Sequence, residues 1–135
     1  TRPPAPSLAL VPPTGPSIPA KPVTAADVRK LIHRRRLRDQ YFGGDMLADP
    51  AWDMLLDLFA AGMEQKDVSV SSLCIAAAVP PTTALRWISA MTEAGMLIRR
   101  FDPNDGRRVF ISLSDDANTR MQQYFANLDG NIAVI

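Results

Sequence analysis

The chain has 135 residues, a formal net charge of +1 and a single cysteine, Cys74. This length fits one ordinary domain, and the balanced charge excludes a polycation that coats nucleic acid by bulk attraction. A single cysteine excludes an intramolecular disulfide and is typical of the reducing cytoplasm, where we expect the protein to act. No apolar run approaches the roughly 20 residues of a membrane span, and no signal-peptide pattern is present, so we expect no membrane association.

Residues 1–23 hold eight of the twelve prolines. Such a composition predicts a Pro-rich disordered arm, because it offers few large side chains to a core. The spacing Pro3-Pro4-Ala5-Pro6 also fits a ligand for an SH3-type domain, although we favour a linker. Residues 24–130 are then expected to form one domain with a helix at each end.

Thr24-Ala25-Ala26-Asp27 matches a capping box and predicts a helix over residues 24–42, with Val28, Leu31 and Ile32 on its apolar side. Basic residues then interrupt this side at Arg34, Arg35, Arg36 and Arg38. We interpret them as a solvated helix face; contact with DNA backbone or with an acidic partner is the alternative. His33 has no companion at metal-ligand spacing and is expected on the surface.

Asp49-Pro50 has the form of a cap followed by a first-turn proline and predicts a second helix, which Gly62 is expected to end. Apolar residues recur through it at helical spacing and are expected in the core: Trp52, Leu55, Leu56 and Phe59. The aspartates at positions 49, 53 and 57 could indicate a metal or acid–base site. We favour the polar side of an amphipathic helix, because no histidine joins them.

The most informative stretch runs from Ser69 to Leu113. Its boundaries predict two helices, then two strands that fold back around a polar turn at 102–107: Ser71–Ala78, Thr82–Ala94, Met96–Phe101 and Arg108–Leu113. This order is a helix-turn-helix followed by a β-hairpin wing, and Val68–Val70 can add a short third strand. The expected fold class is therefore mainly α with a small antiparallel β-hairpin wing.

The second of these helices, residues 82–94, separates into two faces. An inward face is predicted from helical spacing at Ala84, Trp87, Ile88 and Met91, and the outward face carries Thr82, Thr83, Arg86, Ser89 and Glu93. Short hydroxyl side chains permit close approach to a major groove, and an arginine can bond guanine through two N–H groups. Arg86 is the best candidate for reading a base. The hairpin adds cations for phosphate or a minor groove at Arg99, Arg100, Arg107 and Arg108.

The run from Ser69 to Ser114 resembles the winged-helix core of MarR-type transcriptional regulators. VSVSSL resembles the entry to the first motif helix, PPTTALRWISAMTEAGMLIRR the recognition helix and following strand, and DPNDGRRVFISLS the wing. The resemblance implies a homodimer that binds palindromic double-stranded DNA, with Thr82, Thr83 and Arg86 in the major groove. It places the wing's Asp-x-Arg pattern on Asp105 and Arg107, the latter near the minor groove. The chain departs from the family pattern at Ala78, Gly106 and Ala117.

Ser114-Asp115-Asp116 caps a final helix over 115–128, whose apolar stripe comprises Ala117, Met121, Tyr124, Phe125 and Leu128. Together with the helix over 24–42, this stripe could form a two-fold interface, so we expect a homodimer. Residues 132–135 are expected to form a frayed tail.

The predicted function is a sequence-specific DNA-binding transcriptional regulator, with residues 82–94 in the major groove and residues 102–108 on the minor groove or backbone. The predicted DNA contacts are Thr82, Thr83, Arg86, Ser89, Arg100, Arg107 and Arg108. A winged-helix module that docks a protein instead of DNA is the alternative. No Gly-rich phosphate loop, catalytic triad or metal-ligand set is present, so we predict no enzyme, catalytic residue, metal or cofactor.

Two ligand-related questions remain open from the sequence. Cys74 is expected to be a small buried hydrophobic residue, and a redox-sensing thiol is the alternative. Many regulators that resemble this chain release DNA when a small aromatic molecule binds, but core and pocket residues look identical in one sequence. We therefore predict no effector.

Overall fold

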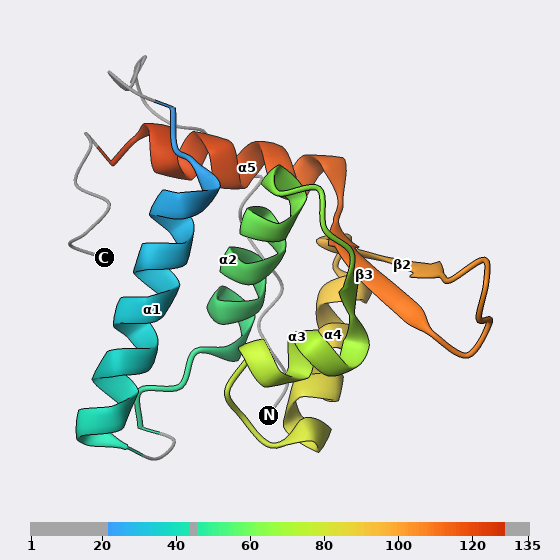
Figure 1. The fold of residues 1–135 in the computed structure, drawn as a ribbon, viewed down its shortest axis with the longest axis horizontal. Coiled ribbons are helices and arrows are strands. Elements are labelled where there is room, and N and C mark those ends of the chain that lie inside the picture. Colours follow the sequence, from blue (N-terminus) through green and yellow to red (C-terminus); the bar gives the residue numbers. More distant parts are fainter. Residues whose placement is uncertain (1–21, 44–45, 129–135) are drawn as a thin grey trace.

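The computed structural model describes residues 22–43 and 46–128, which form a helical body with a hairpin projecting from one side (Figure 1). The helices of this part are α1 (Ala25–Phe42), α2 (Pro50–Met63), α3 (Val70–Ala76), α4 (Pro81–Glu93) and α5 (Asp115–Ala126). The strands β1 (Val68–Ser69), β2 (Leu97–Phe101) and β3 (Val109–Leu113) form an antiparallel sheet in the order β1-β3-β2. The predicted fold class and the third strand are confirmed. Most of the predicted Pro-rich arm, and the tail at 132–135, lie outside the described residues.

Side-chain caps explain where most of the helices begin. Thr24 Oγ1 accepts a hydrogen bond from the backbone N–H of Asp27 at 3.2 Å, and the Asp27 carboxylate accepts one from the Thr24 N–H at 3.1 Å. This is the predicted capping box, which satisfies two donors that a helix start otherwise leaves unpaired. The predicted caps of α2, α3 and α5 are likewise formed by Asp49, Ser69 and Ser114.

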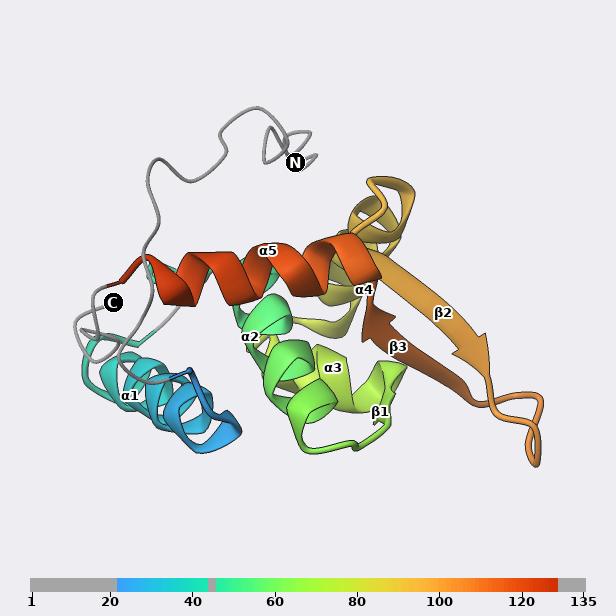
Figure 2. The ribbon, with the colours of Figure 1, turned by 90° about the horizontal axis from the view of Figure 1, so that it is seen from above.

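Helix α2 is the centre of the body because its residues belong to both hydrophobic clusters. One cluster joins α2 to α3, α4 and the sheet through Met54, Leu73 and Ile88, all at most 1% exposed. The other joins α2 to α1 and α5, where the rings of Phe59 and Phe125 stack with centroids 5.6 Å apart. Seen from above, α5 runs from beside α1 to the root of the sheet (Figure 2). The winged part and the outer helices therefore share one central helix.

The expectation that the arginines near position 35 face solvent is wrong for Arg35, and the same holds for Asp53 on α2. Arg35 is 8% exposed and Asp53 is 4% exposed. Arg35 Nε donates to one Asp53 oxygen at 2.6 Å, and Arg36 Nη2 donates to the other at 2.7 Å. Arg35 follows Val28 and Leu31 at helical spacing, so it continues the stripe that faces α2. The structure thus places an ion pair where the apolar stripe ends.

The regular spacing of the aspartates on α2 has a structural cause. Asp49 caps the helix, Asp53 pairs with Arg35 and Arg36, and Asp57 accepts a hydrogen bond from Arg29 at 2.7 Å. Arg29 also contacts Glu64 at 2.8 Å, and this hydrogen bond lowers the pKa of the Glu64 carboxyl. These carboxylates bind α1 to α2 instead of facing open solvent.

Helix α2 does not end at Gly62, as the sequence suggested, but continues to Met63. The left-handed residue that turns the chain is Gln65, with φ of +57°. The turn is closed by hydrogen bonds from the Gln65 N–H to the Gly62 carbonyl and from the Lys66 N–H to the Ala61 carbonyl. Glycine permits a left-handed conformation but does not require it, so it can also occupy a last helical turn.

Candidate nucleic-acid interface

The turn between α3 and α4 is built on an unusual backbone conformation. Ala78 has φ of +56°, in the left-handed region that glycine adopts without strain. This is the position at which the sequence has alanine where related motifs have glycine. At the other end of α4, Gly95 has φ of +82° and the Met96 N–H donates to the Met91 carbonyl at 3.0 Å. These two turns fix the direction in which α4 leaves α3 and in which β2 leaves α4.

Helix α4 has the two faces that its sequence predicts. Ala84, Ile88 and Met91 are buried, and Trp87 is half-buried against the same core. The solvent-facing stripe contains Thr82, Arg86, Ser89 and Glu93, with Thr83 half-buried at its side. Leu85 also belongs to this stripe and is 46% exposed. Because Leu85 is the one large aliphatic side chain in it, the stripe is mostly polar, as a surface for a major groove requires.

The register of β2 against β3 assigns the hairpin residues to two faces. Residues paired across antiparallel strands point to the same side, so Arg99 and Phe101 share the inner face of the sheet with Ile111 and Val109. Arg99 reaches α4, where its Nη2 donates to Ser89 Oγ at 3.3 Å. Arg99 was seen in the sequence as one of several wing cations but was not among the predicted DNA contacts. The register, which one sequence does not define at this detail, joins it to the α4 stripe.

Arg100 and Arg108 lie on the opposite, outer face of the hairpin with Phe110. Their guanidinium carbons are 5.1 and 5.3 Å from the centroid of the Phe110 ring, a cation–π distance. Arg100 also forms an ion pair of 2.6 Å with Asp67, the residue before β1. The structure therefore does not bring Arg100 beside Thr82 and Arg86, because alternate residues of a strand point to opposite faces.

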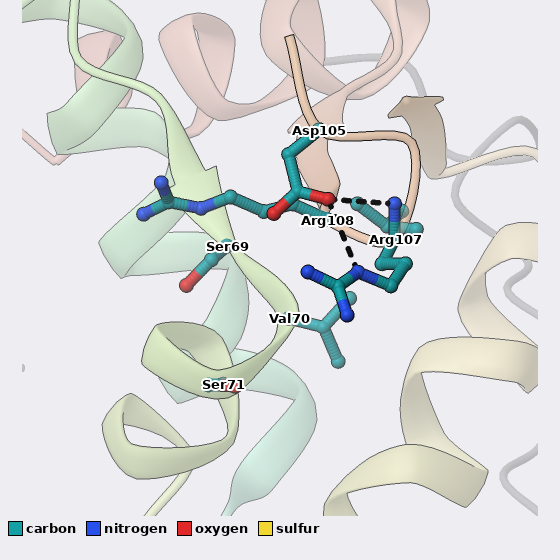
Figure 3. Close-up of a pocket in the computed structure, with 7 residues that line it drawn as sticks. Ser69, Val70, Ser71, Asp105, Arg107 and Arg108 are labelled. Atoms are coloured by element: carbon teal, nitrogen blue, oxygen red, sulfur yellow. Dashed lines mark hydrogen bonds and ion pairs between the residues drawn. The ribbon is translucent and has the colours of Figure 1, made fainter. Parts of the chain in front are cut away.

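A shallow pocket lies between the tip of the hairpin and the beginning of α3 (Figure 3). Its lining includes Ser69 and Ser71 on one side and Arg107 and Val109 on the other. Arg107 is 95% exposed at its side chain, and its backbone N–H donates to Asp105 Oδ1 at 3.1 Å. The Arg107 Nε is 3.5 Å from the same oxygen (Figure 3). The Asp-x-Arg pattern thus shapes the wing tip and leaves the guanidinium accessible to an anion.

The exposed cations of α1 lie apart from this surface. Lys30, Arg34 and Arg38 are exposed, but α1 is at the opposite end of the body from the hairpin in both views (Figures 1 and 2). Within one chain, the basic segment of α1 and the α4 stripe therefore do not form one basic surface.

Other chemistry finds little material in the described part of the chain. Between residues 22 and 128, apart from 44–45, no group of three or more His, Cys, Asp or Glu side chains could hold a metal ion. No helix in the same region has the length and apolar character to cross a membrane. Cys74 is half-buried, not fully buried as expected, and burial raises the pKa of its thiol. A raised pKa keeps the thiol protonated at neutral pH and lowers its reactivity.

The fold and this surface define a winged helix-turn-helix protein. No family model and no curated protein sequence matches the chain, so the comparison depends on solved structures. NadR in complex with 4-hydroxyphenylacetate is similar with a TM-score of 0.55 and 16% identity, over 81% of this chain and 67% of NadR. MepR from S. aureus in its DNA-binding conformation gives 0.55 and 16%, over 83% of this chain and 82% of MepR. Heme-free PefR gives 0.51 and 14%, over 82% and 91%.

These structures are MarR-family regulators, and the chain has the winged-helix fold of that family. The resemblance seen in the sequence from Ser69 to Ser114 is therefore confirmed at the level of the fold. At 14% to 16% identity the likeness extends to the fold and no further. The functional assignment has to come from the surface of this chain itself.

Proposed function

We propose that the protein is a sequence-specific DNA-binding transcriptional regulator. Its recognition helix, residues 82–94 of the sequence, enters the major groove, and the wing at 102–108 lies on the minor groove or the backbone. One observation carries the proposal: the polar stripe of α4 is joined to the hairpin by the Arg99–Ser89 hydrogen bond of 3.3 Å. Hydroxyl and guanidinium groups from two elements thereby form one surface, which suits bases and phosphates together.

The residues of this surface have different roles in the proposal. Arg86 reads a base edge in the major groove, with Thr82, Thr83 and Ser89 beside it. Arg107 contacts the minor groove or its phosphates, and Arg108 and Arg100 add positive potential from the outer face of the wing. To the contacts predicted from the sequence the geometry adds Arg99, beside α4, and Ser71, across the pocket from Arg107. A hydroxyl and a guanidinium on two sides of a pocket suit a phosphate oxygen.

We further propose that two chains bind one operator as a homodimer through the helices over 24–42 and 115–128. The end of α1 supports this, because Tyr41 and Phe42 are 79% and 74% exposed and Leu37 lies one turn earlier at 43%. Exposed aromatic rings on a helix favour association with an apolar partner surface. A two-fold pair would set two recognition helices about one turn of DNA apart, roughly 34 Å. Such a regulator works where the DNA is, which we take to be the cytoplasm.

The proposal is tested by titrating the full chain against random duplex DNA at two salt concentrations, using fluorescence anisotropy and sequencing of the bound fraction. Binding that weakens steeply with salt and enriches an inverted repeat is the expected result. The absence of binding at low salt would refute the proposal and favour the winged-helix module that docks a protein. Leu85 alone offers little apolar area on α4 for such docking.

Arginine variants separate the two parts of the interface. Arg86→Ala should weaken binding to the selected duplex by about 1–3 kcal/mol and relax the preference at one base position. Arg107→Ala should weaken all sequences more evenly and reduce the salt slope by about one. Arg38→Ala, which removes an exposed arginine at the far end of the molecule, is the matched control. Parental affinity and base preference in both Arg86→Ala and Arg107→Ala would contradict the docking arrangement.

The dimer is tested independently by light scattering after size-exclusion chromatography. The parent should elute with the mass of two chains, and a Tyr41→Glu/Phe42→Glu variant should shift towards one chain. A monomeric parent at micromolar concentration would remove the interface from the proposal. NadR was crystallised with 4-hydroxyphenylacetate, but we propose no effector for this chain.

A further inference from the structure

The hairpin ends in an aromatic side chain that the fold does not use. Phe101 is the last residue of β2 and is 68% exposed. On the inner face its cross-strand neighbour is Val109, which is half-buried. A phenyl ring left this open to water contributes little to the stability of the fold. The ring is therefore available to a ligand.

The position of Phe101 relative to α4 indicates what the ligand is. Phe101 lies two residues beyond Arg99 on the same face of β2, about 7 Å farther along the strand. Arg99 is bonded to Ser89 at the edge of the α4 stripe. With α4 in a major groove, Arg99 lies at the phosphate backbone that borders it, and Phe101 lies past that backbone, on the side of the minor groove.

The chemistry around Phe101 favours DNA as its partner over an apolar protein surface. The hairpin from 97 to 113 carries four arginines and two aspartates, and one of the arginines, Arg107, is 95% exposed at its side chain. A positive hairpin complements a phosphate backbone. A phenyl ring forms no hydrogen bond with a phosphate, but the sugar carbons that line a minor groove are apolar. Aromatic and aliphatic side chains of minor-groove proteins also enter between base steps.

We infer that Phe101 is a DNA-contacting residue of the wing, which packs its ring on the sugar and base edges of the minor groove next to the recognition-helix site. The inference rests on the proposed DNA-binding function and adds to it a contact that is apolar. Phosphate contacts by arginine release counterions and make affinity depend on salt, whereas an apolar contact releases none. Phe101 and Arg107 therefore contribute to affinity in ways that a salt titration separates.

The test uses the full chain and the duplex enriched from the random pool, with affinity measured at four or more salt concentrations. Phe101→Ala should lower the affinity about tenfold at every salt concentration and leave the slope of log affinity against log salt unchanged. Phe101→Leu, which keeps an apolar group, should restore most of the affinity. Ile98→Ala is the matched control, because Ile98 is 48% exposed on the opposite face of the same strand. Thermal unfolding of each variant verifies the fold.

Three outcomes would overturn the inference. Phe101→Ala could bind as the parent does, or Ile98→Ala could lose affinity equally, which would indicate general damage to the hairpin. In both cases the parent still binds DNA, so the proposed function stands and the role of Phe101 falls. If the parent shows no salt-dependent binding to any duplex, the proposed function and the role of Phe101 fall together.

Discussion

The ion pair between α1 and α2 allows a quantitative prediction about stability. Asp53→Asn keeps the shape of the side chain and removes its charge. The Asp53 carboxylate is 4% exposed and receives Arg35 Nε at 2.6 Å and Arg36 Nη2 at 2.7 Å. Without it, the Arg35 guanidinium, whose side chain is 9% exposed, is a buried charge without a counter-ion. Breaking a buried pair in this way costs about 3–5 kcal/mol of the free energy of unfolding.

The chain contains a matched control for burial. Asp67 and Arg100 form an ion pair of the same length, 2.6 Å, with side chains 61% and 53% exposed. Asp67→Asn should therefore cost about 0.2–1 kcal/mol, because solvent screens the pair. The comparison between Asp53→Asn and Asp67→Asn isolates the effect of burial at constant distance and constant chemistry.

The assay is equilibrium unfolding in urea, followed by far-UV circular dichroism at one fixed protein concentration, since dimerisation would make stability depend on concentration. A double variant, Arg35→Met/Asp53→Leu, replaces the buried charges by apolar groups and should regain most of the stability lost in Asp53→Asn. Arg36 then keeps its ion pair with Asp39, at 3.3 Å. If Asp53→Asn costs no more than Asp67→Asn, the reasoning from burial is refuted.

The remaining predictions concern two turns and one surface pair. Ala78→Gly should raise the free energy of unfolding by about 0.5–1 kcal/mol, because the left-handed φ of +56° strains alanine. Conversely, Gly95→Ala should lower it by about 1 kcal/mol through the backbone alone, since an added Cβ would meet nothing within 4 Å; urea unfolding measures both, and effects of the same sign would contradict the argument. Arg29 lowers the pKa of Glu64, so their stabilisation is present above the ordinary carboxyl pKa and is lost as pH falls through the lowered value. Glu64→Gln should thus cost about 0.5 kcal/mol near pH 7 and progressively less towards pH 3, and a cost that does not change with pH would exclude this electrostatic origin.

The winged-helix surface shows how far local signals reach. The polar stripe of α4 is predicted correctly because Ala84, Ile88 and Met91 recur at helical spacing, so the opposite side must face water. Exposure of Leu85 at 46% was not foreseen, because the edge of an apolar stripe depends on what packs beside it. Arg99 and Arg100 look equivalent in sequence. Only the pairing of β2 with β3 sends one to Ser89 and the other to Asp67.

The outer helices show the opposite case, in which a sequence pattern was interpreted too simply. The run around Arg35 has the composition of a solvated face, and the aspartate spacing on α2 has the composition of another. Neither pattern contains information about the other helix, which is 18 residues away at the Arg35–Asp53 contact. Side by side, the two sets of charges neutralise each other, and Arg35 becomes buried. A charge is interpreted correctly only when its partner is known.

The sequence by itself determined the order of the elements, the caps that begin most helices, and the polar stripe of α4. These features depend on residues within a few positions of one another, through backbone hydrogen bonds and helical or strand periodicity. The tertiary structure decided which arginines are held in ion pairs, which face of the hairpin accompanies α4, and that Phe101 has no partner in the fold. Those features depend on contacts between residues far apart in the chain, and the register and packing that create them are set by the whole core.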